Sequence, residues 1–320
     1  MAHEFDLIRD YFQPLSRVAM DEVGIGDDGA VLNCPPQSQL VVVTDTLVEG
    51  VHFPMEALPG DIGWKALAVN LSDLAAMGAT PAFFSLALSL PERCNHAAWL
   101  NAFAAGLATL AEGYQLPLIG GDTTRSDRLT VTVTAQGWVR EGRAVLRQTA
   151  RPGDKLYVTG TLGDGALGLQ AWQNQWDSEA YAVSLAKLNR PEPRVEVGAL
   201  LGTYASSAID VSDGLLADVT HLIEASGVGA ALDMTAIPLS AAMQQQIDDT
   251  PQAWSMPLSG GDDYELCFTL PPERIAAFEQ ACRPLAIPIR PIGCITAGQT
   301  LVLNNRPENL TLHSLGYQHF

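Results

Sequence analysis

Apolar residues in the first half of the chain fall into short runs with the length of buried strands and long runs with the length of buried helices. Strands are predicted at 40–44 (LVVVT) and 83–90 (FFSLALSL), and helices at 61–77 (DIGWKALAVNLSDLAAM) and 97–112. Gly78 and Pro81 follow the first helix, which is typical of a helix end. Asp45 comes directly after the first strand, so we place it at the end of that strand.

Two further strands are predicted in this half. Residues 116–119 form a short apolar run that leads into the glycine-rich sequence Gly120-Gly121-Asp122. Residues 129–139 (LTVTVTAQGWV) alternate between polar and apolar, which predicts a strand with one covered face. The other face of that strand is rich in threonine and suited to pairing between sheets.

The second half begins after a turn at 151–154 (RPGD), so we place a domain boundary within 141–153. Strands are predicted at 155–159, 207–211 and 264–269, and helices at about 164–174, 214–226 and 272–282. This alternation predicts two domains of the α/β (α+β) class, at residues 1–148 and 149–320.

The composition narrows the class of protein. The chain has 320 residues, 47% of them hydrophobic, which is enough for a sizeable core. It has no apolar run of the roughly 18 residues that a membrane-spanning helix needs, and its first residues, MAHEFDLIRDYF, lack the apolar segment of a signal peptide. The five cysteines form no CxxC pair and no zinc-binding pattern with histidine. We therefore expect a cytoplasmic protein with reduced thiols and no membrane partner.

The chain is strongly acidic. It carries 18 basic against 36 acidic residues, a formal net charge of -18. A nucleic-acid-binding protein needs a basic face, so we expect no nucleic-acid partner.

Several aspartates share one local context, a glycine-rich turn that often follows an apolar strand. They are Asp27 and Asp28 (GIGDDGA), Asp45 (VVVTDT), Asp122 (LIGGDTT), and Asp210 and Asp213 (AIDVSDG). Asp73 differs because it lies inside the apolar helix, with Asn70 on the same helix face. A turn aspartate is usually a cap or an Asx turn, and that reading stays open at each position.

The counter-charge for these carboxylates is scarce. The chain has only three lysines, Lys65, Lys155 and Lys187. A carboxylate on an apolar helix needs a partner to offset its desolvation. Divalent cations fit this role, and Mg²⁺ prefers hard oxygen ligands and also binds substrate phosphates. The neighbouring glycines let the backbone approach such phosphates closely.

Two segments match the dinucleotide fingerprint G-x-G-x-x-G, at 24–29 and 163–168. The first contains Asp27 and Asp28, which would repel a pyrophosphate not bridged by metal, and it leads into a strand-like run, AVLNC. The second lies between a strand and a helix, but a lone match is weak evidence for a dehydrogenase. The chain has no GxxxxGK[ST] phosphate loop and no protein-kinase motifs in kinase order.

Seven motifs occur in a fixed order: GIGDDGAVL, TDTLVEGVHF, KALAVNLSDLAAMGATP, LIGGDTTR, YVTGTLGDGALGL, AIDVSDGL and SGGDDYELCF. Together they resemble the thiamine-monophosphate kinase family, from about residue 22 to the final GYQHF. The family is related to aminoimidazole ribonucleotide synthetase and selenophosphate synthetase. The resemblance implies an N-terminal mixed sheet that pairs into a β-barrel in a homodimer, with ATP and several Mg²⁺ ions beside it. The C-terminal α/β domain would complete the active site.

The resemblance also implies transfer of a phosphoryl group from ATP to thiamine phosphate, and it assigns roles to residues. The implied metal ligands are Asp28, Thr44, Asp45, Asp73, Asp122, Asp210 and Asp213. The implied nucleotide contacts are Gly121, Asp122, Arg147 and Ser212, and the implied catalytic residues are Asp45, Asp122 and Arg147. The implied contacts to thiamine phosphate are His52, Asp262 and Tyr317. Asp262 stands where many members carry Glu, so its carboxylate is one methylene shorter.

Two alternatives remain. One is a related enzyme with another acceptor, although the residues before GIGDDG hold no reactive cysteine of the selenophosphate synthetase kind. The other is a non-catalytic, metal-stabilised binding protein, which would need the cation sites but not Arg147, His52 or Tyr317.

Overall fold

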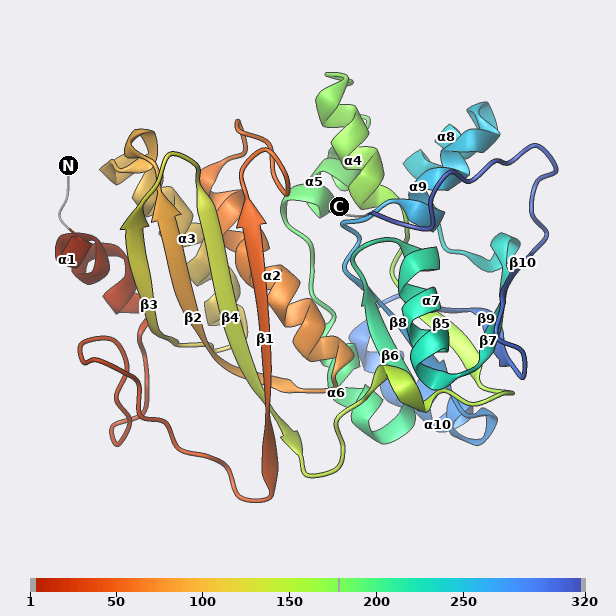
Figure 1. The fold of residues 1–320 in the computed structure, drawn as a ribbon, viewed down its shortest axis with the longest axis horizontal. Helices are drawn as coiled ribbons and strands as arrows, with labels where there is room; N and C mark the ends of the chain where they lie inside the picture. The colour runs from red at the N-terminus through yellow and green to blue at the C-terminus, as the bar shows by residue number, and fades with distance from the viewer. Residues whose placement is uncertain (1–3, 178, 318–320) are drawn as a thin grey trace. The chain divides into compact units, whose positions relative to one another are not determined.

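The computed structural model describes residues 4–177 and 179–317 (Figure 1). The last three residues of the motif GYQHF therefore lie outside the described part. The chain divides into two compact units. The N-terminal unit holds the chain up to Leu74 together with Ala79–Gly142, and the C-terminal unit holds Ala75–Gly78 together with the chain from Arg143 onward.

The N-terminal unit is built on a four-stranded mixed sheet with the order β1-β4-β2-β3. Its strands are β1 (Ser38–Val48), β2 (Thr80–Leu90), β3 (Leu118–Arg125) and β4 (Thr130–Arg140). β4 is antiparallel to both β1 and β2, whereas β2 and β3 are parallel. Within the described residues this sheet is open, with β1 and β3 at its edges, and forms no closed barrel. The dimeric barrel stays a prediction.

Alternation along β4 explains why only one face of the sheet is covered. Val131, Val133 and Val139 are buried, while the threonines between them are half-buried on the opposite face. Helices α2 (Pro59–Ala76) and α3 (Ala97–Gly113) lie over the valine face (Figure 1). These two helices touch so closely that a Cβ on Gly106 would lie 1.9 Å from the carbonyl oxygen of Gly60.

Residues 4–15 pack beside this sheet as short helical turns. They comprise α1 (Glu4–Leu7), the π-helical turn η1 (Ile8–Phe12) and the 3-10 turn η2 (Gln13–Leu15). A further 3-10 turn, η3 (Glu92–Cys94), follows β2. Phe12 meets Phe103 of α3 edge to face, at 6.4 Å between ring centroids. The strand-like reading of AVLNC is wrong, since only an isolated bridge between Val23 and Val31 forms there.

The C-terminal unit contains a six-stranded sheet with the order β10-β7-β9-β5-β8-β6. Its strands are β5 (Lys155–Thr159), β6 (Ser207–Val211), β7 (Gly229–Asp233), β8 (Glu265–Leu270), β9 (Ile289–Thr296) and β10 (Leu301–Asn304). Its α-helices are α4 (Asp164–Gln173), α5 (Ala182–Asn189), α6 (Val195–Tyr204), α7 (Leu215–Ser226), α8 (Ala241–Asp249), α9 (Ser255–Ser259) and α10 (Ile275–Cys282). Short 3-10 turns are η4 (Arg147–Thr149), η5 (Met234–Ala236), η6 (Pro251–Trp254), η7 (Pro272–Arg274) and η8 (Arg283–Leu285).

Both faces of this sheet are covered, which gives three layers. On one face, stacked Tyr157 and Phe268 meet Phe278 of α10. On the other face, Leu156 of β5 and Val219 of α7 belong to one continuous apolar core. Strands covered on both faces read as near-continuous apolar runs, which is why β5, β6 and β8 were predictable.

Several predicted boundaries are corrected by the structure. Asp45 is not at a strand end, because β1 continues to Val48, and Gly120–Asp122 lie inside β3 rather than in a turn after it. The helix predicted from 272 starts as a 3-10 turn. Strands β7, β9 and β10 and helices α5, α6, α8 and α9 were not predicted. Over the residues described, no helix is both long and apolar enough to span a membrane.

Candidate active site

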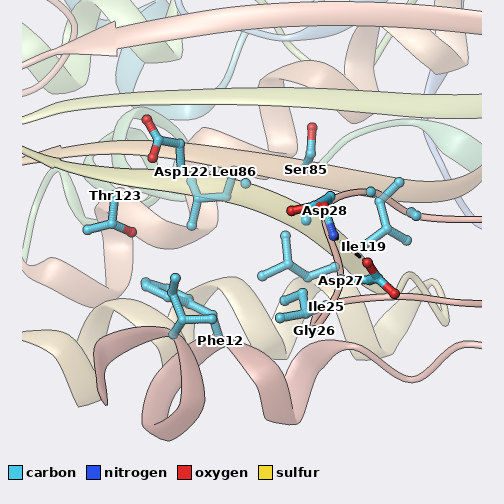
Figure 2. Close-up of a pocket in the computed structure, with 16 residues that line it drawn as sticks. Phe12, Ile25, Gly26, Asp27, Asp28, Ser85, Leu86, Ile119, Asp122 and Thr123 are labelled. Carbon is cyan, nitrogen blue, oxygen red and sulfur yellow. Dashed lines mark hydrogen bonds between the residues drawn. The ribbon is translucent and has the colours of Figure 1, made fainter. Parts of the chain in front are cut away.

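A pocket of about 700 Å³ lies at the β3 edge of the N-terminal sheet (Figure 2). It is formed by the glycine-rich turn at 25–30, the start of β3 at 118–123, and Ile8 and Phe12 from the N-terminal turns. Two predicted metal ligands, Asp28 and Asp122, belong to its lining. The volume is within the range that suits a small-molecule ligand.

Local backbone geometry explains the glycines of this pocket. Gly26 has a φ of +134°, a region that residues with a side chain rarely adopt. A Cβ on Gly121 would lie 1.9 Å from the carbonyl oxygen of Leu86 in the neighbouring strand. The bare Gly121 backbone therefore allows β3 to run along β2 at the rim of the pocket.

The two aspartates of the pocket are held differently. Asp28 is exposed in its turn, and its amide donates to Oδ1 of Asp27 at 2.8 Å. Asp122 pairs with Ala87 across β2–β3, which places it on the face that the helices do not cover. Figure 2 shows Asp122 and Ser85 pointing away from Phe12.

Asp45 and Asp73 lie elsewhere in the N-terminal unit. Asp45 pairs with the buried Val133 of β4, so its half-buried side chain is on the helix-covered face. Asp73 is half-buried on α2. Thr44 is on the opposite face of β1, where its hydroxyl lies 2.8 Å from that of Thr134. The strand order separates this group from Asp122 by β4 and β2.

His52 is oriented by the main chain just after β1. Its Nδ1 accepts a hydrogen bond from the Val48 amide at 2.9 Å, and its own carbonyl accepts one from the buried Lys65 at 3.2 Å. Because Nδ1 accepts, this arrangement selects the neutral ring that carries its proton on Nε2. That Nε2–H group is suited to donate to a phosphate oxygen.

In the C-terminal unit, the turn 211–214 after β6 is held by a carboxylate that sequence reasoning missed. Oδ2 of Asp218 accepts the amides of Ser212, Asp213 and Gly214 at 3.1, 3.2 and 3.1 Å. Burial raises the pKa of Asp218 to about 7, and repulsion from Asp210 and Asp213 adds to this. Asp210 and Asp213 are therefore each close enough to Asp218 to repel its carboxylate.

The turn 260–264 before β8 lies against the turn 211–214. The Asp262 amide donates to the carbonyl of Ser212 at 2.9 Å. Asp262 and Tyr264 have φ values of +69° and +50°, in the left-handed region. Between them, the buried Asp263 accepts the amides of Gly163 and Gly165 at 2.7 and 3.0 Å. Desolvation raises the pKa of Asp263 to about 7, against the effect of those amides and of Lys187.

A buried ion network begins at the next residue. Both carboxylate oxygens of Glu265 bind the guanidinium of Arg194, at 2.7 and 2.6 Å. Lys187 reaches Glu265 at 3.3 Å and the buried Asp164 at 3.5 Å. The network fixes the start of β8 behind the turn 260–264.

Tyr317 and Arg147 complete the set of predicted site residues. The Tyr317 amide donates to the carbonyl of Asp213 at 3.0 Å, while its side chain is 48% exposed. Arg147 is exposed, and its carbonyl accepts hydrogen bonds from the hydroxyls of Ser207 and Ser226 at 2.9 and 2.7 Å.

The model of the family "AIR synthase related protein, N-terminal domain" matches residues 26–139, and that of its C-terminal domain matches residues 151–304. The thiamine-monophosphate kinase of Salmonella typhimurium is 47% identical over 324 residues, which cover 99% of this chain and 98% of the relative. The chain belongs to the thiamine-monophosphate kinase family.

Solved structures agree with this assignment to the family of thiamine-monophosphate kinases. The enzyme from Stenotrophomonas maltophilia K279a has a TM-score of 0.86 and 43% identity, and the match covers 94% of this chain and 96% of that one. The structure described as "AaThiL complexed with AMPPCP and TMP" has a TM-score of 0.79 and 30% identity, with 99% of this chain and 96% of that one covered. The resemblance seen in the motifs is thus confirmed, and the chain is an enzyme of the kinase class.

The structure brings some of the predicted residues of this kinase together in two groups, to which Thr44, Asp45, Asp73, His52 and Arg147 do not belong. Asp28, Gly121 and Asp122 line the pocket, and Asp210, Ser212, Asp213, Asp262 and Tyr317 belong to the joined turns of the C-terminal unit. In the described residues no three His, Cys, Asp or Glu side chains are close enough to form a ready metal site. Of the two missed carboxylates, Asp263 had one available signal, its place next to Asp262 in the same motif. Asp218 lies three residues beyond the motif AIDVSDGL, within the helix predicted at 214–226.

The donor set of the kinase nevertheless fits a hard cation. The repulsion of Asp218 by Asp210 and Asp213 would be relieved by a divalent ion. On α2, Oδ1 of the buried Asn70 has no hydrogen-bond partner among the described residues, one helical turn from Asp73. Carboxylate and amide oxygens are ligands that Mg²⁺ accepts.

Proposed function

We propose that this chain transfers the γ-phosphoryl group of ATP to thiamine phosphate, producing ADP and thiamine diphosphate. The observation that carries the proposal is the likeness to a thiamine-monophosphate kinase structure with AMPPCP and TMP, which covers 99% of this chain. The ATP analogue and thiamine phosphate of that relative correspond to the two substrates proposed here. A cytoplasmic location suits this reaction.

The acceptor is a phosphate oxygen that is already ionised at neutral pH, so the enzyme needs no general base. The obstacle is the repulsion between two polyanions. Bound Mg²⁺ ions supply charge neutralisation and in-line alignment of the phosphates. The proposed ligands are Asp28, Thr44, Asp45, Asp73, Asp122, Asp210 and Asp213.

Protein groups hold the nucleotide. The exposed Arg147 adds positive charge that stabilises the transferring group. The proposed catalytic residues are Arg147, Asp45 and Asp122. Gly121 and Ser212 approach the nucleotide through the backbone and a hydroxyl. The pocket beside Gly121 has a volume that suits such a ligand.

Three residues select the acceptor. The Nε2–H of His52 donates to the phosphate of thiamine phosphate. The exposed ring of Tyr317 stacks on a thiamine ring, where a cation–π contact contributes roughly 0.5–2 kcal/mol. Asp262 accepts a hydrogen bond from the exocyclic amine of the aminopyrimidine.

The arrangement of the N-terminal sheet supports the proposal of a homodimer. Its uncovered face exposes Leu40 and Val42, at 48% and 56%. A second copy that packs on this face closes the two open sheets into the expected barrel, and it sets the β1 edge of one copy beside the β3 edge of the other. Asp45 of one copy would then approach Asp122 of its partner.

A phosphoryl-transfer assay over a panel of phosphorylated acceptors tests the function. We expect Mg²⁺-dependent formation of thiamine diphosphate from thiamine phosphate, and poor turnover of free thiamine, which lacks the ionised nucleophile. Efficient turnover of another acceptor would identify the related-enzyme alternative. Metal binding without any ATP turnover would identify the non-catalytic alternative.

A further inference from the structure

Three consecutive peptide groups of the turn 211–214 are each held from both sides. Their N–H groups, from Ser212, Asp213 and Gly214, all point to Oδ2 of Asp218. One carboxylate oxygen therefore binds the whole turn, and Asp218 is itself only 2% exposed in the first turn of α7.

The carbonyls of the same three peptide groups accept hydrogen bonds from elsewhere in the unit. The Val211 carbonyl accepts the Tyr264 amide at 2.8 Å, and the Ser212 carbonyl accepts the Asp262 amide at 2.9 Å. The Asp213 carbonyl accepts the Tyr317 amide at 3.0 Å.

A hydrogen bond at one end of a peptide group polarises the group and fixes its plane, so it strengthens and orients the bond at the other end. Residues at the two ends are then coupled through a rigid plane. Two of the three amides on the far side belong to Asp262 and Tyr317, which are proposed acceptor contacts. The close packing of the turns continues at Gly261, where a Cβ would lie 2.5 Å from the Ser212 carbonyl oxygen.

The position is an unfavourable one for a carboxylate. Asp218 is almost fully buried, so its carboxylate loses its contact with water. A residue that served only to begin α7 could be an exposed cap. This residue is buried where one of its oxygens reaches all three peptide groups of the turn.

We propose that Asp218 is a positioning residue that sets the turn 211–214 and, through its peptide groups, the placement of Asp262 and Tyr317. Asp218 thereby links the proposed metal and nucleotide residues of this turn to the acceptor contacts. The inference rests on the proposed function only for the roles of those residues, since the hydrogen-bond relay is a property of the protein alone.

Two variants and a control test the relay. Asp218→Ala removes the carboxylate that accepts the three hydrogen bonds, and Asp218→Asn keeps one carbonyl oxygen in nearly the same place. The control is Asp154→Asn, because Asp154 is also buried, at 4% exposure, and also accepts a main-chain amide, that of Arg151 at 3.0 Å. Asp154 is not among the proposed site residues.

The first measurement is hydrogen exchange of single amides in the full-length protein without ligands. In Asp218→Ala we expect exchange at Asp262, Tyr264 and Tyr317 to rise by at least about tenfold, with a smaller rise, about threefold, in Asp218→Asn. Asp154→Asn should leave these three amides unchanged. Unchanged exchange in a folded Asp218→Ala protein would overturn the proposal, and if that variant does not fold, unchanged exchange in Asp218→Asn would do so.

The second measurement separates positioning from stability. We expect Asp218→Ala to raise the KM for thiamine phosphate by about tenfold or more. In Asp218→Asn this KM should stay close to the wild-type value. A fall in Tm with both KM values unchanged would show a helix cap only and would overturn the proposal. If the wild-type chain does not turn over thiamine phosphate, the proposed function fails while the exchange result still decides the relay.

Discussion

Asp45 and Asp122 lie at opposite edges of one four-stranded sheet and on opposite faces of it. Asp45 shares a row with Val133, Leu86 and Gly121, so the row that begins at Asp45 ends next to Asp122. Three strand spacings make that row about 14 Å long. Ligands of one Mg²⁺ ion lie about 2.1 Å from it, so Asp45 and Asp122 of one chain cannot bind the same ion.

The separation predicts complementation between inactive variants. Asp45→Asn and Asp122→Asn should each lower turnover by at least tenfold, about 1.4 kcal/mol, because a metal ligand loses its charge while its volume is kept. If Asp45 of one copy meets Asp122 of its partner, a mixture of the two variants, after subunit exchange, contains sites in which both residues are native. We expect an equal mixture to recover about a quarter of wild-type turnover.

The control for complementation is a mixture of Asp45→Asn with Asp45→Asn/Asp122→Asn, in which no site can regain both native residues. Light scattering at micromolar concentration should give the mass of two chains. A monomeric mass, or no recovery after proven subunit exchange, would contradict the shared site.

Gly121 and Gly120 offer a matched pair on β3. A Cβ on Gly121 would lie 1.9 Å from the Leu86 carbonyl oxygen, whereas a Cβ on Gly120 meets nothing within 4 Å. We expect Gly121→Ala to push β3 off β2, lowering Tm by several degrees and weakening ATP binding. Gly120→Ala should leave Tm nearly unchanged. Equal Tm values for both variants, measured by calorimetry, would show that the strand edge adapts.

Much of the fold was predictable from periodicity, but its polar strand segments were not. The alternation at 129–139 and the apolar runs at 155–159 and 207–211 correspond to β4, β5 and β6. Strand β1 was cut short because the aspartate after LVVVT, Asp45, was taken as its end. On a sheet with one uncovered face, such residues continue the strand: Thr46 pairs with Thr132 across the uncovered face.

The candidate site was predictable only where a motif carried it. Asp28, Gly121 and Asp122 came from the motifs and line one pocket, but the metal, nucleotide and acceptor roles stay predictions. Asp263 accepts main-chain amides from a distant segment, those of Gly163 and Gly165, whereas Asp218 accepts those of the turn just before its own helix. The contacts of Asp263 depend on how distant turns meet, so residue types reveal its place in a motif but not its partners.

The raised pKa of Asp263 predicts how the free energy of unfolding changes with pH. Its pKa is raised to about 7 by desolvation and by Asp164, against the amides of Gly163 and Gly165 and against Lys187. The unfolded chain releases this proton near the ordinary value of 3.8. Because the folded pKa is the higher of the two, the stabilisation of the fold by Asp263 is fully present below the unfolded pKa of 3.8. This stabilisation is lost as the pH rises through the folded pKa of about 7.

The matched variant is Asp263→Asn, which cannot ionise. The other titratable groups contribute equally to the pH dependence of both proteins. The free energy of unfolding of the wild type relative to Asp263→Asn should therefore fall by on the order of 3 kcal/mol between pH 5 and pH 8. Urea titrations at several pH values measure this difference. A difference that stays constant over this range would show that Asp263 keeps one protonation state.

Tyr317 gives the sharpest test of the acceptor pocket. The motifs place it far from the metal ligands along the chain, yet its amide binds the carbonyl of Asp213, a proposed metal ligand. Tyr317→Ala keeps that amide and removes a ring that is 48% exposed, so the turn and the Tm should survive. If the ring stacks on thiamine, the KM for thiamine phosphate should rise several-fold to about thirtyfold, from roughly 0.5–2 kcal/mol of stacking, while the KM for ATP stays the same. Tyr317→Phe is the control, because it keeps the ring and should keep the wild-type KM. A lowered Tm with both KM values unchanged would mean that the ring only packs the end of the chain.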